Sequence, residues 1–446
     1  MSKISTPIAD FVKNYAKSDF SRAHMPAHKG KSILGCEHLD ITEINGADVL
    51  YSADGIIEES ESNATELFGT AHTFYSTEGS TLSIKAMLAI AKKNAPAGRK
   101  ILATRNVHKA FIYACALLDI EAEWLYPRSA GHLCDCEITP NDLRQKLRAM
   151  PSLPFALYVT SPNYLGKVLD IAGLSAVCKE FGIYLLVDNA HGAYLAFEEP
   201  SAHPIALGAD ICCDSAHKTL PTLTGGAYLH ISKSFAHYDK NDARNMLSLF
   251  ASTSPSYLIL QSLDLTNSYI ANGFRENLAK IEARINMLKA ELYDLGFECE
   301  KGESLKIVLT KQKCAYSGDE LARHLRAFKI EPEYADRDVI TLMLSTESTD
   351  SDLERIKAAF NALERRSPSI ASLPSIPRPE RVISMREALM SSCERIPTEN
   401  SLGRICASPS VSCPPAIPPI VSGERIDSNT VNALLYYGIT EIDVIK

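Results

Sequence analysis

Residues 184–188 read Tyr-Leu-Leu-Val-Asp, a short apolar run that ends in a carboxylate. A segment with helical spacing of its apolar residues precedes this run at 174–181, and a second run, Ile-Cys-Cys-Asp, occupies residues 211–214. Strands that are apolar on both faces and alternate with helices are typical of a parallel sheet covered by helices on both sides. We therefore predict an α/β fold with a mainly parallel sheet that contains both runs.

The same alternation extends over much of the first half of the chain. Further strands are predicted at 100–104, 155–160 and 227–231, and further helices at 80–93 and 106–117. A helical stretch at 257–295 leads into predicted strands at 304–309 and 339–344 and helices at 319–328 and 353–365. We predict four segments: an N-terminal arm with helices (1–68), a large α/β domain (69–256), a linker helix with a smaller α+β domain (257–366), and a C-terminal domain (367–446) that opens on a Pro/Ser-rich linker at 367–379.

The composition excludes several classes of protein. With 46 basic and 54 acidic residues the net charge is −8, so no general attraction to nucleic acid or anionic lipid is expected. No run of about 18 apolar residues occurs, and the first residues lack an apolar secretory leader, which favours a cytoplasmic protein without a membrane span. The 12 cysteines are scattered, as in a protein with reduced, mostly buried thiols. The pairs Cys134/Cys136 and Cys212/Cys213 lack zinc-site spacings, so no metal is expected.

The stretch Asp214-Ser-Ala-His-Lys218 places a lysine just beyond the apolar run at 211–214. The carboxyl ends of parallel strands are where α/β folds build their ligand sites. Most lysines are ordinary surface charges, and this stretch alone does not exclude that interpretation. A lysine that attacks a carbonyl needs a lowered pKa, which burial or neighbouring cations can provide.

Two further motifs favour a functional lysine over an ordinary surface charge. Asp188 ends another predicted strand, and a lysine paired with a carboxylate matches what pyridoxal phosphate (PLP) requires, because the carboxylate keeps the ring nitrogen protonated. In Ser-Thr-Glu-Gly-Ser-Thr at 76–81, Gly79 permits close backbone approach, and Ser80 and Thr81 offer hydroxyls at a helix N-terminus, where phosphates bind. Each motif has a plain alternative, a helix cap. The three together predict a PLP site.

A set of short motifs then carries a resemblance to a known family. In chain order they are His-Met-Pro-Ala-His-Lys-Gly at 24–30, Asp-Ile-Thr-Glu at 40–43, Phe-Gly at 68–69, Thr-Glu-Gly-Ser-Thr at 77–81, Arg-Asn-Val-His-Lys at 105–109, Asp-Asn-Ala-His-Gly at 188–192, Ser-Ala-His-Lys-Thr at 215–219, Thr-Ser-Pro-Ser-Tyr at 253–257, Gly-Arg-Ile at 403–405, Pro-Pro-Ala-Ile-Pro at 414–418 and Gly-Glu at 423–424. Together they resemble the fold-type-I PLP-dependent ornithine/lysine/arginine decarboxylases. The resemblance covers nearly the whole chain and is weakest over 290–370.

The resemblance implies a role for each matching residue. Lys218 would hold PLP covalently, and Asp188 would pair with its pyridine nitrogen. His108 would stack on one face of the ring and Ala190 would pack on the other. His108 or Lys218 would donate the proton that completes the reaction. The phosphate would be bound by a hydroxyl and imidazole set: Ser80, Thr81, Ser215 and His217.

Two implied roles keep an alternative. His191 could reach the phenolic oxygen of the cofactor, or it could simply pack or cap a helix. Thr253 or Ser254 would approach the phosphate from a second subunit, because the family's sites lie at a dimer interface. The alternative for this pair is a turn before the helix predicted from residue 257.

Several positions depart from the family pattern. Ala27 and Ala416 stand where glycine is usual, and Glu78 where a small amide is common. Ser408 stands where the family tends to carry Glu, and Cys413 where Tyr usually precedes Pro-Pro. The chain also lacks the N-terminal wing of the large inducible enzymes. Because loss of an anion weakens binding of a distal ammonium or guanidinium, these C-terminal changes bear on substrate identity more than on PLP.

The implied activity is decarboxylation of lysine, arginine or ornithine to the corresponding amine and CO2, as in polyamine biosynthesis. The implied assembly is a homodimer or higher oligomer with composite sites, acting on a small amino acid without nucleic acid or membrane. A PLP enzyme of another reaction type, an aminotransferase or a lyase, is the first alternative, because one fold supports many chemistries. A non-catalytic relative is the second, and retention of Lys218, Asp188 and the hydroxyl cup argues against it.

Overall fold

The computed structural model describes residues 4–96, 98, 100–127, 131–235, 238–366, 373–409 and 415–446. The chain divides into two compact units. Unit 1 comprises Met1–Ala97 and Ile171–Leu278, and unit 2 comprises Gly98–Asp170 and Ala279–Lys446. The main sheet has seven strands in the order β1-β7-β6-β5-β4-β2-β3. The α/β fold class is therefore as predicted.

The strands of unit 1 bring several chain ends to one edge of the sheet. β5 (Tyr184–Asp188) and β6 (Ile211–Asp214) are parallel, with Asp188 beside Cys213. β7 (Ala227–Ile231) runs antiparallel to β6, and β1 (His72–Ser76) runs antiparallel to β7, with Ser76 beside Ala227. The carboxyl ends of β1, β5 and β6 therefore share an edge with the amino end of β7, and we call it the site edge.

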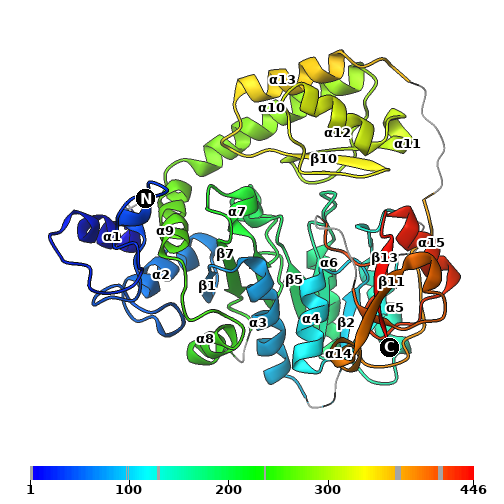
Figure 1. Ribbon diagram of the computed structural model, residues 1–446, viewed down its shortest axis with the longest axis horizontal. Coiled ribbons are helices and arrows are strands. Elements are labelled where there is room, and N and C mark those ends of the chain that lie inside the picture. The colour runs from blue at the N-terminus through cyan, green and yellow to red at the C-terminus, as the bar shows by residue number, and fades with distance from the viewer. Residues whose placement is uncertain are drawn as a thin grey trace. The chain divides into compact units, whose positions relative to one another are not determined.

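Helices of unit 1 flank these strands, and α1 lies farther out, beyond α9 (Figure 1). They are α1 (Pro7–Lys17), α2 (Ile56–Phe68), α3 (Gly79–Lys93), α6 (Ile171–Phe181), the single turn α7 (Ala216–Thr219), α8 (Lys240–Ser248) and α9 (Tyr257–Ala271), with short 3-10 turns η1 (Glu37–Leu39), η2 (Leu50–Ser52) and η3 (Ala193–Phe197). Helix α2 packs against β1 and α9, and α1 packs against α9. Helix α3 packs against β7, so its N-terminus lies close to the site edge.

Unit 2 holds the other three strands of the main sheet and two smaller sheets. β2 (Ile101–Thr104) lies parallel between β3 (Ala122–Leu125) and β4 (Ala156–Thr160), with α4 (Lys109–Leu118) and α5 (Pro140–Ala149). One small sheet has the order β8 (Lys306–Thr310), β10 (Val339–Met343) and β9 (Tyr334–Ala335) and is accompanied by α11 (Lys311–Cys314), α12 (Gly318–Ala327) and α13 (Asp350–Asn361). The other has the order β11 (Cys393–Pro397), β13 (Glu441–Ile445) and β12 (Cys406–Ser408) and is accompanied by α14 (Met385–Met390), η4 (Thr398–Asn400) and α15 (Ser428–Tyr436).

The predicted elements compare closely with these bounds, with some exceptions. The strands predicted at 184–188, 211–214 and 227–231 are confirmed to the residue. The helical stretch predicted at 257–295 is two helices, α9 and α10 (Phe274–Asp294), because the chain turns at Gly273, where φ is +94°. All cysteines in the described ranges are free and most are buried, as expected. Part of the predicted linker, 367–372, and the motif residues Cys413 and Pro414 lie outside the described residues. The division into four segments stays a prediction.

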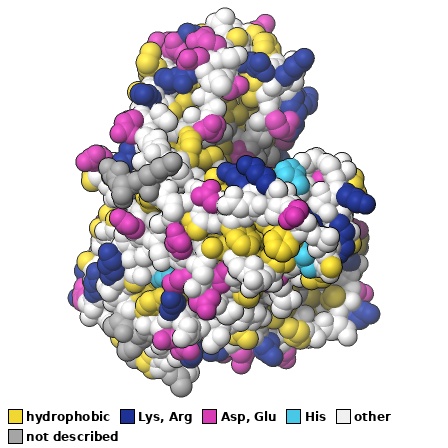
Figure 2. Space-filling model, turned by 90° about the vertical axis from the view of Figure 1, so that its left-hand side faces the viewer, with side chains coloured by type: hydrophobic (Ala, Val, Ile, Leu, Met, Phe, Trp, Pro, Cys, Tyr) yellow, Lys and Arg dark blue, Asp and Glu magenta, His cyan; other side chains and the backbone are white. Residues whose placement is uncertain are grey.

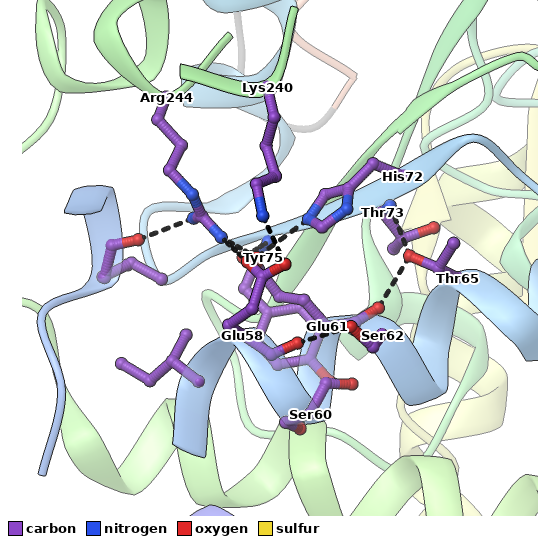
Figure 3. A network of polar contacts seen from close by, with 12 residues as sticks. Glu58, Ser60, Glu61, Ser62, Thr65, His72, Thr73, Tyr75, Lys240 and Arg244 are labelled. Atoms are coloured by element: carbon purple, nitrogen blue, oxygen red, sulfur yellow. Dashed lines mark hydrogen bonds and ion pairs between the residues drawn. The ribbon is translucent and has the colours of Figure 1, made fainter. Parts of the chain in front are cut away.

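A buried network of charges joins α2, β1 and α8 in unit 1 (Figure 3). The carboxylate of Glu61 is fully buried and accepts hydrogen bonds from Arg244 Nη2 at 2.6 Å and from the backbone N–H of Tyr75 at 2.9 Å. His72 Nε2 lies 3.1 Å from the same carboxylate. Arg244 also bridges to Glu58 Oε2 at 2.5 Å. Each charge has an opposite partner, which is the condition for keeping ions away from water.

Replacement of Arg244 by methionine should destabilise the protein strongly. The variant keeps the apolar stem but leaves the buried Glu61 without its cation, and breaking a buried pair in this way costs roughly 3–5 kcal/mol. The control is Lys93→Met. Lys93, at the end of α3, forms an exposed ion pair with Asp242, which lies on α8 as Arg244 does, and loss of this pair should cost less than about 1 kcal/mol. Urea unfolding of the full chain measures both. Equal losses in the two variants would contradict the assignment.

Candidate active site

The lysine of the predicted site lies on the short turn α7, which directly follows β6 at the site edge. Its Nζ is 3.1 Å from Nε2 of His191. His191 belongs to the turn after β5 and is buried. Because β5 and β6 are parallel neighbours, the turns at their carboxyl ends meet, and this register places the imidazole against the amine. The two groups can share a proton.

Asp188 is the last residue of β5 and is only 2% exposed. Its Oδ1 accepts the backbone N–H of Ala190 at 3.2 Å and lies 3.8 Å from Sγ of Cys213 on the neighbouring strand. Burial, reinforced by the negative charge of Asp188, raises the pKa of the Cys213 thiol well above its usual value. The thiol therefore stays neutral and donates to the carboxylate. The sequence carried no signal for this role of Cys213.

The hydroxyl cup forms where the turn after β1 meets the turn after β6. Ser215 Oγ donates to Ser80 Oγ at 2.9 Å, and the backbone N–H of Gly79 donates to the carbonyl of Gly225 at 2.8 Å. Gly225 has φ +99°, and a Cβ there would lie 2.9 Å from the carbonyl oxygen of Thr77. Only glycine permits this approach of the two backbones. The cup thus combines two hydroxyls with the N-terminus of α3, a 15-residue helix.

The alternative of a plain helix cap does not fit the cup. The cap position of α3 is Glu78, whose side chain makes no capping hydrogen bond, and Ser80 and Thr81 lie inside the first turn. Thr81 is exposed there. His217 is held by a hydrogen bond from its Nδ1 to the Gly226 carbonyl at 2.9 Å, which fixes the orientation of its ring. Ser80 and Thr81 therefore offer their hydroxyls at the N-terminus of α3, where a phosphate can bind.

Ala190, Thr253 and Ser254 are the other predicted residues of unit 1. Ala190 is buried in the turn after β5. Thr253 and Ser254 are exposed in the loop between α8 and α9. The backbone N–H of Ser252 in that loop donates to Glu78 Oε1 at 2.7 Å, so Glu78 connects the loop to the start of α3.

His108 belongs to unit 2, where it follows β2 and caps α4. Its Nδ1 accepts the backbone N–H of Ala110 at 3.1 Å. Helix α4 consequently begins at Lys109 rather than at residue 106 as predicted. The predicted stacking of His108 on a cofactor ring stays a prediction.

One buried residue of the site edge was missed by sequence reasoning. Asp214, fully buried, accepts hydrogen bonds from Asn189 Nδ2 at 2.7 Å and from Nε2 of His203 and of His230, both at 3.0 Å. The two histidines lie outside every motif of the site, so their spacing in the chain gave no indication of this cluster. These ligand-type atoms lie close enough together to hold a metal ion. Their protonation decides against that role, as described below.

The donor set at the site edge fits PLP. A lysine amine, a buried carboxylate and a hydroxyl cup at a helix N-terminus are the groups that an aldehyde, a pyridine nitrogen and a phosphate require. In addition, the buried Oγ1 of Thr219, next to Lys218, has no hydrogen-bond partner among the described residues, which leaves one polar atom for a ligand.

Residues 14–332 match the sequence model of the family described as "Orn/Lys/Arg decarboxylase, major domain". The chain belongs to the Orn/Lys/Arg decarboxylase family. It is 26% identical to the arginine decarboxylase of Bacillus subtilis (strain 168), over 97% of this chain and 93% of that protein. It is 27% identical to the arginine decarboxylase of Halalkalibacterium halodurans, over 96% of this chain and 92% of that protein. An uncharacterized protein of Bacillus subtilis, YaaO, is 28% identical over 97% and 94% of the two chains.

Solved structures of decarboxylases share the fold of this Orn/Lys/Arg decarboxylase. The lysine decarboxylase of Francisella novicida superposes with a TM-score of 0.83 at 17% identity, over 99% of this chain and 81% of that chain. The constitutive lysine decarboxylase of Escherichia coli gives 0.77 at 16% identity, over 99% and 82%. The family membership makes the protein a PLP-dependent amino-acid decarboxylase, as the sequence predicted. Within the described ranges, no helix has the length and apolar character needed to cross a membrane.

Proposed function

We propose that this enzyme decarboxylates a basic amino acid, namely arginine, lysine or ornithine, and releases the corresponding amine and CO2. The support comes from its family and from arginine decarboxylases that align with it over nearly its whole length. The observation that carries the proposal is the site edge of unit 1. There Asp188 ends β5, Lys218 and Ser215 lie on the turn after β6, and Ser80 lies at the start of α3 and pairs with Ser215.

We assign the binding roles within unit 1 as follows. Lys218 would hold PLP covalently, and Asp188 would hold the proton on the ring nitrogen. Ser80 and Ser215, with the first N–H groups of α3, would bind the phosphate, with Thr81 and His217 beside them. Bound PLP supplies an electron sink for the electrons released when the bond from Cα to the carboxylate breaks.

The chain's own groups then manage the protons. His191, 3.1 Å from Lys218 Nζ, can take up or return a proton at that nitrogen when the substrate amine displaces the lysine. Asp188 is suited to its role because a buried carboxylate stabilises a positive charge more strongly than one in water. Ala190 would pack on one ring face and His108 on the other. Either His108 or Lys218 would protonate the carbon that loses CO2.

Glu424 is not the anion that recognises a basic substrate. This carboxylate is 2.9 Å from Arg105 Nη2 in a pair that is almost completely buried, and it also accepts the backbone N–H of Val421 at 2.8 Å. Burial raises the pKa of Glu424, and Arg105 opposes that effect. A carboxylate occupied in this way is held by Arg105 and Val421 within unit 2. Ser408, which stands where the family tends to carry Glu, offers no charge.

The test is to incubate the purified enzyme and PLP with arginine, lysine, ornithine and neutral amino acids as controls. We expect one basic amino acid to yield its amine and CO2 in equal amounts, measured by chromatography and by trapping of CO2. Keto-acid products would support an aminotransferase instead. Decarboxylation restricted to neutral amino acids would refute the basic substrate while leaving the decarboxylase in place.

We also propose that the active unit is at least a homodimer in which Thr253 and Ser254 reach the phosphate of the partner's site. Both residues are exposed, and the neighbouring Ser252 connects their loop to α3 through Glu78. The N-terminal segment of unit 1 exposes large apolar side chains that a second copy could cover, namely Phe20, Met25, Ile33 and Leu34. Figure 2 looks onto the side of the molecule where α1 lies, and hydrophobic side chains gather there among polar ones.

Complementation tests this arrangement. A Lys218→Ala chain and a Thr253→Ala/Ser254→Ala chain, each inactive alone, are mixed, and the mixed dimers are isolated by two affinity tags. Some activity should return, because a symmetric interface leaves one of the two sites with both sets of residues intact. The matched control mixes each chain with itself. Mixed dimers without activity, or a fully active monomer, would contradict the composite site.

A further inference from the structure

Asp214 occupies the point where the two functional turns of the site edge meet. It is the last residue of β6, directly before the turn that carries Lys218. Its Oδ1 accepts from Asn189 Nδ2 at 2.7 Å, and Asn189 directly follows Asp188. All of these side chains except that of Lys218 are almost completely buried.

The two histidines fix the other oxygen of Asp214. His203 Nδ1 accepts the backbone N–H of Ile205 at 3.4 Å, so the proton of the neutral ring lies on Nε2 and is donated to Asp214 Oδ2. His230 has a matching arrangement, with Nδ1 2.9 Å from the hydroxyl of Thr73 and Nε2 facing Oδ2. Nitrogens that carry protons have no lone pair for a metal. The cluster is therefore a hydrogen-bond hub.

The charge state of the hub agrees with this geometry. Burial alone would raise the pKa of Asp214, but His203 and His230 outweigh it and hold the pKa far below its usual range. Burial lowers the pKa of His230, against the opposing effect of Asp214. Asp214 is thus an anion that accepts from three side-chain donors, each of which carries its proton toward it.

The contacts of Asp214, Asn189, His191 and Lys218 form a closed loop that returns to Asp214. Asp214 holds Asn189, and the same turn carries Asp188 on one side of Asn189 and His191 on the other. His191 contacts Lys218 Nζ, and Lys218 lies on the turn that begins immediately after Asp214. A rotation of the 188–191 turn would therefore move a carboxylate and an imidazole relative to the lysine.

We propose that Asp214 is a positioning residue that, through Asn189, sets Asp188 and His191 against Lys218. The proposal rests on the roles given to Asp188 and Lys218 under the proposed function. The cost of misplacing reacting groups by about 1 Å can reach a hundredfold in rate.

The first variant is Asp214→Asn, which keeps the shape but turns one acceptor into a donor. The new amide N–H then faces at least one of the three N–H donors. We expect kcat to fall about tenfold to a hundredfold with KM within about threefold. The pH at which the absorption band of the lysine-bound cofactor changes should move by about one unit. A shift of one unit corresponds to a change of 1.36 kcal/mol in how the surroundings of Lys218 favour one protonation state over the other.

The decisive variant is the exchange Asp214→Asn/Asn189→Asp. The amide N–H of residue 214 can then donate to the new carboxylate at 189, and its carbonyl oxygen can accept from both histidines, so every hydrogen bond of the hub has a partner again. We expect the exchange to recover most of the spectral titration and part of kcat. A purely structural loss through an altered charge at 214 would not be reversed by a change at 189.

The matched control is Asp264→Asn. Asp264 is also a fully buried aspartate of unit 1, but it accepts from the backbone N–H of Ala9 and from Ser60, away from the site edge. We expect this variant to lose stability while the spectral titration and KM stay as in the wild type. Equal effects in the two single variants, or no recovery in a folded exchange variant, would overturn the proposal.

The titration requires no substrate, so it separates this proposal from the proposed function. If the wild type decarboxylates no basic amino acid, the spectral comparison among the three variants still applies. If Asp214→Asn fails to fold, Asn189→Ala removes only the link to the turn after β5. It should give the same direction of spectral shift at a smaller size, and an unshifted titration there would refute the positioning role.

Discussion

Replacement of Lys218 by alanine is expected to abolish both the visible absorption of the bound cofactor and turnover. The reason is covalent: without the ε-amine, the aldehyde of PLP has no nitrogen to join at the carboxyl end of β6. The fall in kcat should exceed about a thousandfold, since the group that both binds the cofactor and is displaced by substrate is lost. Absorbance spectroscopy and borohydride reduction followed by peptide mapping measure the adduct.

The control for this experiment is Lys233→Ala. Lys233 is an exposed lysine of the same unit, just beyond the other end of β7, and its loss should leave colour and turnover unchanged. A coloured, reducible adduct that persists in Lys218→Ala would show that another lysine carries the cofactor.

Replacement of Asp188 by asparagine should keep some PLP binding and lose most of the rate. The amide cannot hold the ring nitrogen in its protonated form, and the loss of such an electrostatic partner costs roughly 3 kcal/mol or more of barrier, about a hundredfold in rate. The contact from Cys213 survives in the variant as a weak hydrogen bond, so the strand ends should not rearrange. Single-turnover kinetics at saturating PLP measure the effect.

A matched control lies at the opposite edge of the same two strands. Asp210 precedes β6 and accepts the backbone N–H of Leu185 at 2.8 Å. Asp210→Asn alters a partly buried carboxylate that connects the start of β6 to β5 without touching the site edge, so turnover should be unchanged. If Asp188→Asn turned over substrate as fast as Asp210→Asn, the role of Asp188 would be refuted.

The sequence predicted those parts of the fold whose physics is local. β5, β6 and β7 were placed to the residue, because each is a short run with apolar side chains on both faces. β1 was missed, because its polar residues His72 and Thr73 interrupt the apolar pattern. Their partners, Glu61 and His230, are supplied by α2 and by β7. Helices were predicted within 1–68, but α2 was given no bounds for the same reason, since it buries Ser60 and Glu61.

The candidate site likewise has a part that could be predicted from the sequence and a part that could not. Lys218 and Asp188 were predictable, because a charged residue that ends an apolar run falls at the functional edge of a parallel sheet. The hub around Asp214 was not predictable, because His203 lies in a connecting loop and His230 in an antiparallel strand, and only the tertiary fold brings them to one carboxylate. From the sequence alone, Cys213 was interpreted as an ordinary buried cysteine.

The pairing of β1 with β7 has a consequence for how the protein folds during its synthesis on the ribosome. Ser76 pairs with Ala227, so β1 emerges long before its partner strand is made. At about 5–20 residues per second, the roughly 150 intervening residues take on the order of 8–30 s to synthesise. During that interval β1 lacks its partner strand β7, and the buried carboxylate of Glu61 lacks its cation, Arg244, which is made later still. The hydroxyl cup, which joins Ser80 to Ser215, is likewise incomplete until both of these distant parts of unit 1 have been made.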